Sequence, residues 1–170
     1  PLPVEGWNAQ ISLMTGMAAA ELMLAGDIGL RRTVPPADSE RLESLRPAAE
    51  AAERELAGGS PEGEPWISSA LALLEYRRGD DLKAAAFCTR CLSSRGANGP
   101  PGALARVVLA LASWRLERHE QGLVTLKQAD EQISLAFNKG LGLSLHSLGG
   151  YWFDWVLARM LLREGQEQVL

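Results

Sequence analysis

Two segments of the chain share one layout: residues 71–80 read LALLEYRRGD and residues 109–118 read LALASWRLER. In each, a run of alanine and leucine leads to an aromatic residue and an arginine, followed by a short polar stretch suited to a turn. Alanine and leucine are strong helix formers, and a layout that recurs within one chain indicates a repeated structural unit. The two segments therefore predict two copies of one helical unit.

Glycines, prolines and polar clusters divide the whole chain into helical blocks. Apolar residues recur every three or four positions in these blocks, and no stretch alternates as a strand would, so we expect an all-α fold. Pro47 lies inside the second block, which therefore either bends or begins there. The predicted helices span residues 8–25, 38–57, 66–78, 82–94, 101–117, 120–138 and 151–167.

The ending of the layout occurs a third time, at residues 21–27, which read ELMLAGD. The three endings lie 53 and 38 residues apart. A period of about 34 residues is typical of tetratricopeptide repeats. The excess in each spacing falls in the connectors that contain Pro35-Pro36 and Pro100-Pro101, so the spacing is compatible with helical hairpins of that kind.

On these residues the chain resembles the tetratricopeptide family. The family's leucine and small residues match Leu71, Ala72, Ala84, Cys91, Leu109, Ala110, Gly122 and Ala129. The family's usual first-helix tryptophan is displaced, because Ser68 stands in its place and Trp66 lies two residues earlier. The resemblance implies an α-α superhelix of about three hairpins in one domain, residues 1–170. The parts would be a degenerate first pair, two regular pairs and a capping helix, at residues 8–57, 66–94, 101–138 and 151–167.

The C-terminal residues carry a second resemblance. Residues 151–164 read YWFDWVLARMLLRE, which is similar to a helix that closes repeat regions in large bacterial serine/threonine kinases. This similarity implies the C-terminal, non-catalytic regulatory region of such a kinase. The chain begins with Pro1 rather than methionine, and we therefore expect it to start partway through a longer protein or to have been trimmed.

Composition argues against two classes of partner. The net charge is −4 and the isoelectric point is about 5.3, so the concentrated basic face of a nucleic-acid-binding protein is not expected. The longest apolar run, residues 107–112, is far shorter than the roughly 18 residues needed to span a bilayer. We therefore expect no nucleic-acid partner and no membrane contact by this segment.

The residues that could carry chemistry do not form a catalytic or metal-binding pattern. Cys88 and Cys91 lie one turn apart inside a predicted helix, and we interpret them as small packing residues without a metal. Nucleotide-binding and kinase catalytic motifs are absent from the sequence. His146 lies beside serines but lacks a third partner. The sequence thus predicts no enzyme activity, no catalytic residue and no cofactor.

The tetratricopeptide resemblance implies a concave groove lined by the first helix of each pair. The residues it assigns to this groove are Trp66, Ser69, Leu73, Tyr76, Arg77, Leu104, Val107, Leu111, Trp114 and Arg115. Aromatic residues beside arginines are typical of binding hot spots, although Tyr76 and Trp114 could instead pack between helices. We expect Trp152 and Trp155 to pack against the last hairpin as a cap.

The function expected from these observations is a non-catalytic interaction or scaffold module that binds a protein or peptide. Two alternatives remain open. One is a self-association domain, whose groove is filled by a second copy in a homo-oligomer. The other is a helical domain that senses a small molecule in an enclosed pocket.

Overall fold

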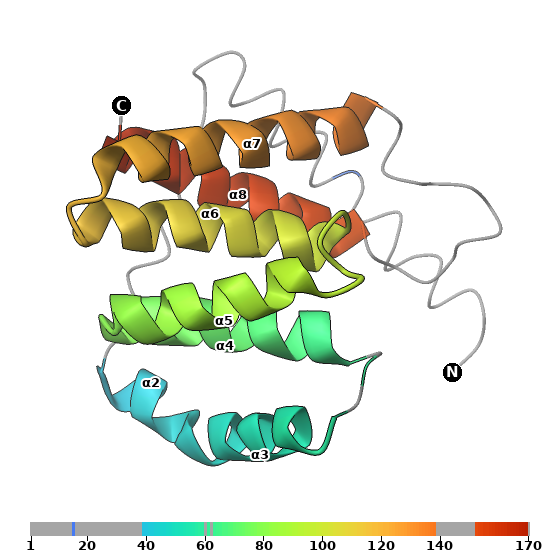
Figure 1. Ribbon diagram of the computed structural model, residues 1–170, viewed down its shortest axis with the longest axis vertical. Coiled ribbons are helices and arrows are strands. Elements are labelled where there is room, and N and C mark those ends of the chain that lie inside the picture. The colour runs from blue at the N-terminus through green and yellow to red at the C-terminus, as the bar shows by residue number, and fades with distance from the viewer. Residues whose placement is uncertain (1–14, 16–38, 60, 62, 139–151, 170) are drawn as a thin grey trace, which may run out of the picture. The chain divides into compact units, whose positions relative to one another are not determined.

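The computed structural model describes residues 15, 39–59, 61, 63–138 and 152–169 (Figure 1). Within these ranges all regular structure is helical, which confirms the all-α prediction for this part of the chain. The seven described helices belong to one compact unit, residues 37–170. They are α2 (Ser39–Ser44), α3 (Arg46–Ala57), α4 (Glu64–Arg78), α5 (Asp81–Ser93), α6 (Pro100–Arg115), α7 (His119–Asn138) and α8 (Trp152–Val169). Of the predicted helix 8–25, only Thr15 is described, and it is helical.

The helical block predicted over residues 38–57 is divided near Pro47. The sequence allows either a bend or a helix start there, and the structure has two helices, with Leu45 between them and Pro47 in the first turn of α3. Proline has no backbone N–H, so it cannot donate the helical hydrogen bond to the carbonyl four residues earlier, at Glu43. It is tolerated in a first turn, where that N–H would have no helical partner.

The predicted turn between the third and fourth blocks is a tight left-handed helix ending. Gly79 has φ = +86°, and its N–H donates to the carbonyl oxygen of Tyr76 at 3.1 Å. The N–H of Asp80 donates to the carbonyl oxygen of Glu75 at 3.0 Å. The Asp80 carboxylate then accepts from the N–H of Lys83 at 2.9 Å and caps α5. Two residues, Gly79 and Asp80, thus connect the end of α4 to the start of α5, which makes the pair a hairpin.

The second copy of the layout has the same ending. Glu117 has φ = +61°, and its N–H donates to the carbonyl oxygen of Trp114 at 3.1 Å. The N–H of Arg118 donates to the carbonyl oxygen of Ser113 at 2.9 Å. Both hydrogen bonds have the same offsets as those made by Gly79 and Asp80. The sequence repeat therefore corresponds to a repeated backbone geometry in the α4–α5 and α6–α7 hairpins.

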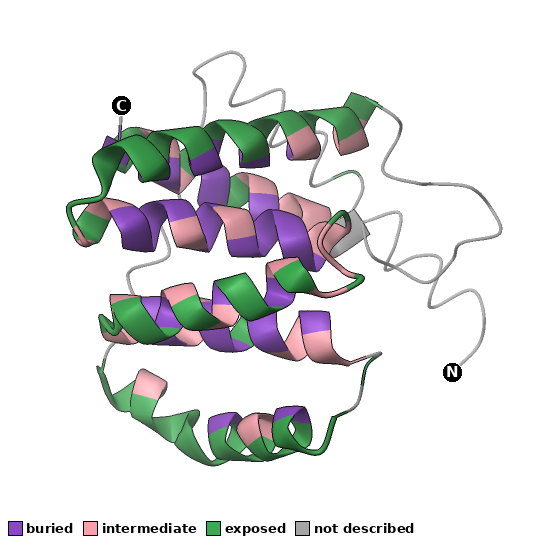
Figure 2. Ribbon diagram, viewed as in Figure 1, coloured by how far each residue is buried: buried purple, intermediate pink, exposed green. Residues whose placement is uncertain are grey.

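The main core surrounds α6. This helix packs against α4, α5, α7 and α8, and most of its residues are buried (Figure 2). Its apolar residues occupy its whole circumference, as expected for a helix covered on all sides. Gly102 lies so close to the preceding loop that an added Cβ would be 2.0 Å from the carbonyl oxygen of Ala97. The core thus requires glycine at the start of its central helix.

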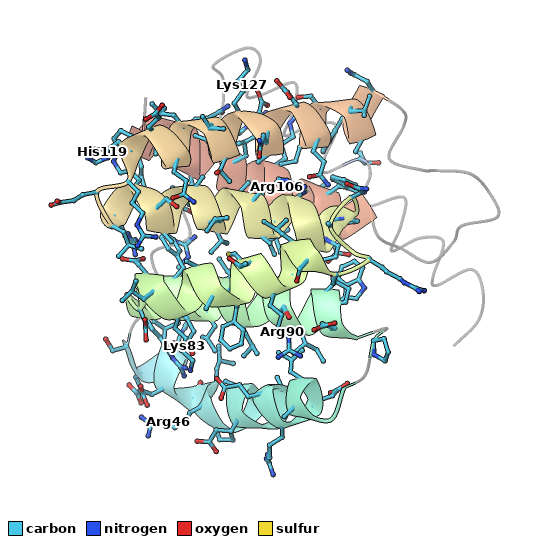
Figure 3. The ribbon with its side chains drawn as sticks, in the orientation of Figure 1. Arg46, Lys83, Arg90, Arg106, His119 and Lys127 are labelled. Carbon is cyan, nitrogen blue, oxygen red and sulfur yellow. The ribbon has the colours of Figure 1, made fainter. Side chains whose placement is uncertain are left out.

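Charged side chains of α5 contact α3 and also link α5 to α4 within the hairpin. Lys83 lies 2.9 Å from the Glu53 carboxylate, and Arg90 lies 2.7 Å from the Glu64 carboxylate. Arg90 also donates to the carbonyl oxygen of Leu56 at 3.0 Å, near the end of α3. Figure 3 shows Lys83 and Arg90 extending from α5 toward these helices. Because the ion pairs are largely exposed, we assign them a positioning role more than a large stabilising one.

The C-terminal helix packs on the last hairpin. α8 contacts α6 and α7, and it buries the stripe formed by Ala158, Leu161 and Leu162. Trp155 is half-buried against the main core, whereas the side chain of Trp152 lies outside the described part of the chain. None of the described helices is both long and apolar enough to cross a membrane.

Candidate functional site

A groove of about 370 Å³ opens between α2, α4, α6 and α8. Its lining is mainly apolar, with one charged residue contributed by α4 and another by α8. The lining residues are Leu42, Leu45, Trp66, Ser69, Ala70, Leu73, Leu74, Arg77, Pro100, Pro101, Leu104, Asp154 and Leu157.

Helical periodicity explains which residues of α4 reach the groove. Trp66, Ser69, Leu73 and Arg77 are three or four positions apart, so they lie on one face of the helix. The first turns of α6 and α8 contribute Pro100, Pro101 and Asp154 at the same end of the groove as Trp66, and α2 contributes Leu42 and Leu45 near the end of α4. α4 forms the longest continuous part of the lining.

Half of the sequence-assigned groove residues line this groove. They are Trp66, Ser69, Leu73, Arg77 and Leu104. The other five, which are Tyr76, Val107, Leu111, Trp114 and Arg115, are elsewhere. Val107 and Leu111 are buried in the main core, so they present no surface to a partner.

Tyr76 is fully buried between helices. Its hydroxyl donates to Gln168 of α8 at 3.3 Å, and the guanidinium of Arg115 lies 3.9 Å from the centre of its ring. Arg115 also donates to the carbonyl oxygen of Tyr76 at 3.0 Å. Burial raises the pKa of the Tyr76 phenol above its ordinary value, and the charge of Arg115 opposes this shift. Tyr76 and Arg115 thus join α4, α6 and α8 to one another.

Trp114 packs between α6 and α7. Its ring centre lies 4.3 Å from that of His119, and an added Cβ on Gly122 would meet the tryptophan ring at 3.7 Å. Both aromatic residues whose orientation the sequence left open therefore contact neighbouring helices. Trp66 is the one sequence-assigned aromatic residue that lines the groove.

The position of α8 explains why Leu111 is covered. An added Cβ on Gly165 would lie 3.4 Å from the Leu111 side chain and 3.3 Å from the Leu126 side chain, so α8 approaches α6 and α7 closely there. The two guanidinium nitrogens of Arg77 donate to the two carboxylate oxygens of Glu164, each at 2.6 Å. Glycine at position 165 and this paired contact hold α8 against α4 and α6.

The residues that sequence reasoning missed come mostly from the helices at the two sides of the groove. Leu42 and Leu45 of α2, and Asp154 and Leu157 of α8, are each three residues apart. Their spacing indicates a shared helical face. It does not indicate which neighbouring helix that face meets.

The two charged residues of the groove differ in whether they have a salt-bridge partner. Arg77 is paired with Glu164, and this hydrogen bond raises the pKa of Arg77. Asp154 has no salt-bridge partner among the described residues. Burial raises the pKa of the Asp154 carboxyl, and a backbone hydrogen bond in its own helix partly offsets this. Among the described residues, the groove thus has one cation paired with a carboxylate and one carboxylate without a salt bridge.

The two cysteines lie outside the groove and are buried. The Cys91 thiol donates to the carbonyl oxygen of Pro65 at 3.4 Å. Burial raises the pKa of Cys91 to about 11 and raises that of Cys88 further. In the described part of the chain, no group of three or more histidine, cysteine or acidic residues is arranged to hold a metal ion.

Comparison with known proteins assigns no family to this fold and groove. No family model, curated protein or solved structure matches the chain. The class that can be stated is an all-helical protein with two consecutive hairpins and an apolar groove.

Proposed function

We propose that this chain is a non-catalytic interaction module of the tetratricopeptide-like kind, which binds a segment of another protein in the groove. The α4–α5 and α6–α7 hairpins support the repeat assignment because they share a turn geometry and pack consecutively. In a stack of such pairs, the first helices lie side by side and leave an extended face. Here these helices are α4 and α6, and both line the groove.

The observation that carries the proposal is an accessible apolar groove. Leu45 keeps 48% of its surface exposed at one side of the groove, and Ala70 is exposed on α4. Apolar surface gathered in a groove and rimmed by charged residues is typical of a protein-binding site. Among the described lining residues, no group is arranged for bond-making chemistry, and the polar side chains are those of Ser69, Arg77, Asp154 and Trp66.

Blocking the groove tests this function. Ala70→Arg places a long charged side chain in the groove from an exposed helical position, so the fold should tolerate it. Ala86→Arg is the matched control, because Ala86 is exposed on α5 outside the groove. We expect cross-linking and mass spectrometry in the source cells to recover a partner with wild type and Ala86→Arg but not with Ala70→Arg.

Recovery of the same partner by all three proteins would refute the groove as the binding site. Circular dichroism should show equal helicity in the three proteins, so that loss of binding is not loss of fold. Light scattering across a dilution series measures the oligomeric state and so tests the self-association alternative. A dimer that Ala70→Arg dissociates would identify a second copy as the groove's occupant.

We further propose that this module is the regulatory end of a bacterial protein kinase. The support is the sequence of α8, whose aromatic start and Leu-Leu-Arg-Glu continuation, residues 161–164, resemble the closing helix of such proteins. The test is the coding sequence upstream of Pro1. A glycine-rich nucleotide loop and a His-Arg-Asp catalytic loop there would support the assignment, and a different upstream domain would refute it.

A further inference from the structure

The size of the groove limits what it can hold. Its volume of about 370 Å³ corresponds to roughly a dozen water molecules and lies near the lower end of ligand pockets. The lining residues of α4 extend from Trp66 to Arg77, which is about 16 Å along the helix axis. The groove therefore accommodates a few apolar side chains along a length of three helical turns. A helix that inserts a stripe of apolar residues meets both requirements.

The ends of the groove differ in charge. Trp66, Pro100 and Asp154 come from the first turns of α4, α6 and α8, so the N-termini of three helices lie at this end. Helix N-termini carry partial positive charge and favour the negative C-terminal end of a docked helix. Arg77, near the opposite end, is already neutralised by Glu164. The dipoles thus favour a partner helix that is antiparallel to α4.

Asp154 adds a specific requirement to that orientation. Asp154 is one of the residues that line the groove, and it has no salt-bridge partner among the described residues. A lysine or arginine in the last turn of a docked antiparallel helix would lie at this end of the groove. That position is also favourable for the cation within its own helix, because it lies at the negative end of the dipole.

We infer that the partner is an amphipathic helix that docks antiparallel to α4 and places a lysine or arginine of its last turn against Asp154. This inference rests on the proposed function of the groove, and it adds the chemistry and direction of the partner. An alternative role for Asp154 is to stabilise the N-terminus of α8 alone. The two roles differ in whether Asp154 distinguishes between charged and neutral ligands.

Synthetic helices provide the probe. Each acetylated and amidated peptide has about 14 residues, with leucines on one face, to match the three turns of the groove. One peptide carries lysine in its last turn, its twin carries glutamine there, and a third carries lysine in its first turn. Binding of each labelled peptide to the full chain is measured by fluorescence polarisation. The proteins are wild type, Asp154→Asn, Ala70→Arg and the control Asp130→Asn, whose carboxylate is exposed on α7 outside the groove.

We expect wild type and Asp130→Asn to bind the last-turn lysine peptide about fivefold more tightly than the glutamine twin, as a half-buried charge pair would give. Asp154→Asn should remove this preference and leave the affinity for the glutamine twin unchanged. Ala70→Arg should abolish binding of both peptides.

Three results would overturn the inference. Equal affinity for the lysine and glutamine peptides would refute the role of Asp154. In that case, loss of binding of both peptides to Ala70→Arg would still support binding in the groove. Tighter binding of the first-turn lysine peptide would refute the antiparallel direction. Failure of every peptide to bind, or binding that Ala70→Arg leaves unchanged, would refute the docked helix and the proposed use of the groove together.

Discussion

Exchanging the residue types at the two hairpin turns should shift stability in opposite directions. Gly79 and Glu117 occupy equivalent left-handed positions, at φ = +86° and +61°. Glycine adopts this conformation without strain, whereas for an L-residue the same conformation costs about 1–2 kcal/mol of folding free energy. We therefore predict that Glu117→Gly raises the free energy of unfolding and that Gly79→Ala lowers it.

Neither substitution changes a side-chain contact in the described part of the chain, so the change in the free energy of unfolding comes from the backbone conformation alone. Glu117 is exposed and makes no side-chain hydrogen bond or ion pair among the described residues, so its removal loses no contact. A Cβ at Gly79 would meet no atom within 4 Å, so Gly79→Ala introduces strain without a clash. The greater freedom of glycine in the unfolded chain offsets about 0.4–1 kcal/mol of the cost that an L-residue has in the left-handed conformation. The net change should be about 0.5–1 kcal/mol, positive for Glu117→Gly and negative for Gly79→Ala.

Urea unfolding followed by circular dichroism measures both changes. In a thermal scan, Glu117→Gly should raise Tm by about 2–3 °C for a chain of this length. Glu120→Gly is the control, because Glu120 is exposed and helical, so glycine there should destabilise by about 1 kcal/mol. Equal or lower stability of Glu117→Gly would refute the assignment of strain to that turn.

Four further predictions concern the packing around the groove and the core. In a double-mutant cycle, Arg77→Met and Glu164→Gln should show a coupling free energy of about 0.5–1 kcal/mol in urea unfolding, because the paired side chains are still about a third exposed. Additive effects of the two substitutions would show that this ion pair does not hold α8 in place. Cys88 and Cys91 should resist a thiol reagent at about pH 8 until urea unfolds the chain, because burial raises both pKa values. The pKa of Cys91 is about 11 in the folded chain, compared with an ordinary value of 9.0. The contribution of Cys91 to stability is therefore complete below pH 9.0 and falls as the pH rises from 9.0 to about 11. Urea unfolding at several pH values would detect this fall. Gly102→Ala should lower the free energy of unfolding by about 2–3 kcal/mol, since its Cβ would overlap the carbonyl group of Ala97, and a change below about 0.5 kcal/mol would contradict that packing.

Local signals in the sequence were sufficient to predict most of the helices. Proline, glycine and capping residues determine where α4, α5, α6 and α7 begin and end, and the predicted bounds agree with the structure to within two residues. The sequence does not determine the division at Leu45, because Pro47 is compatible with either a bend or a new helix. Helix ends depend on nearby residues, so one sequence is enough to find them.

The groove was less predictable because its composition depends on contacts between distant segments. Periodicity places Leu73, Tyr76 and Arg77 on neighbouring faces of α4. It does not indicate that α8 covers Tyr76 while Leu73 stays only partly buried. The hydrogen bond from Tyr76 joins residues that are 92 positions apart. No local pattern indicates a contact at that separation.

The position of α8 also explains why the groove is shorter than two stacked hairpins alone would leave. α6 packs more extensively against α5 than against α4, whereas α8 packs more extensively against α6 than against α7. α8 is therefore shifted toward α6 relative to a helix that continued the same arrangement, and Gly165 permits its close approach to Leu111. While α8 is in place, Tyr76 and Leu111 contribute to stability and are closed to a partner. In the described part of the chain, the accessible surface of the groove consists of one face of α4, the N-terminal part of α6 and the side chains beside them. Under the proposed function, specificity for a partner would therefore depend on the charge at each end of the groove.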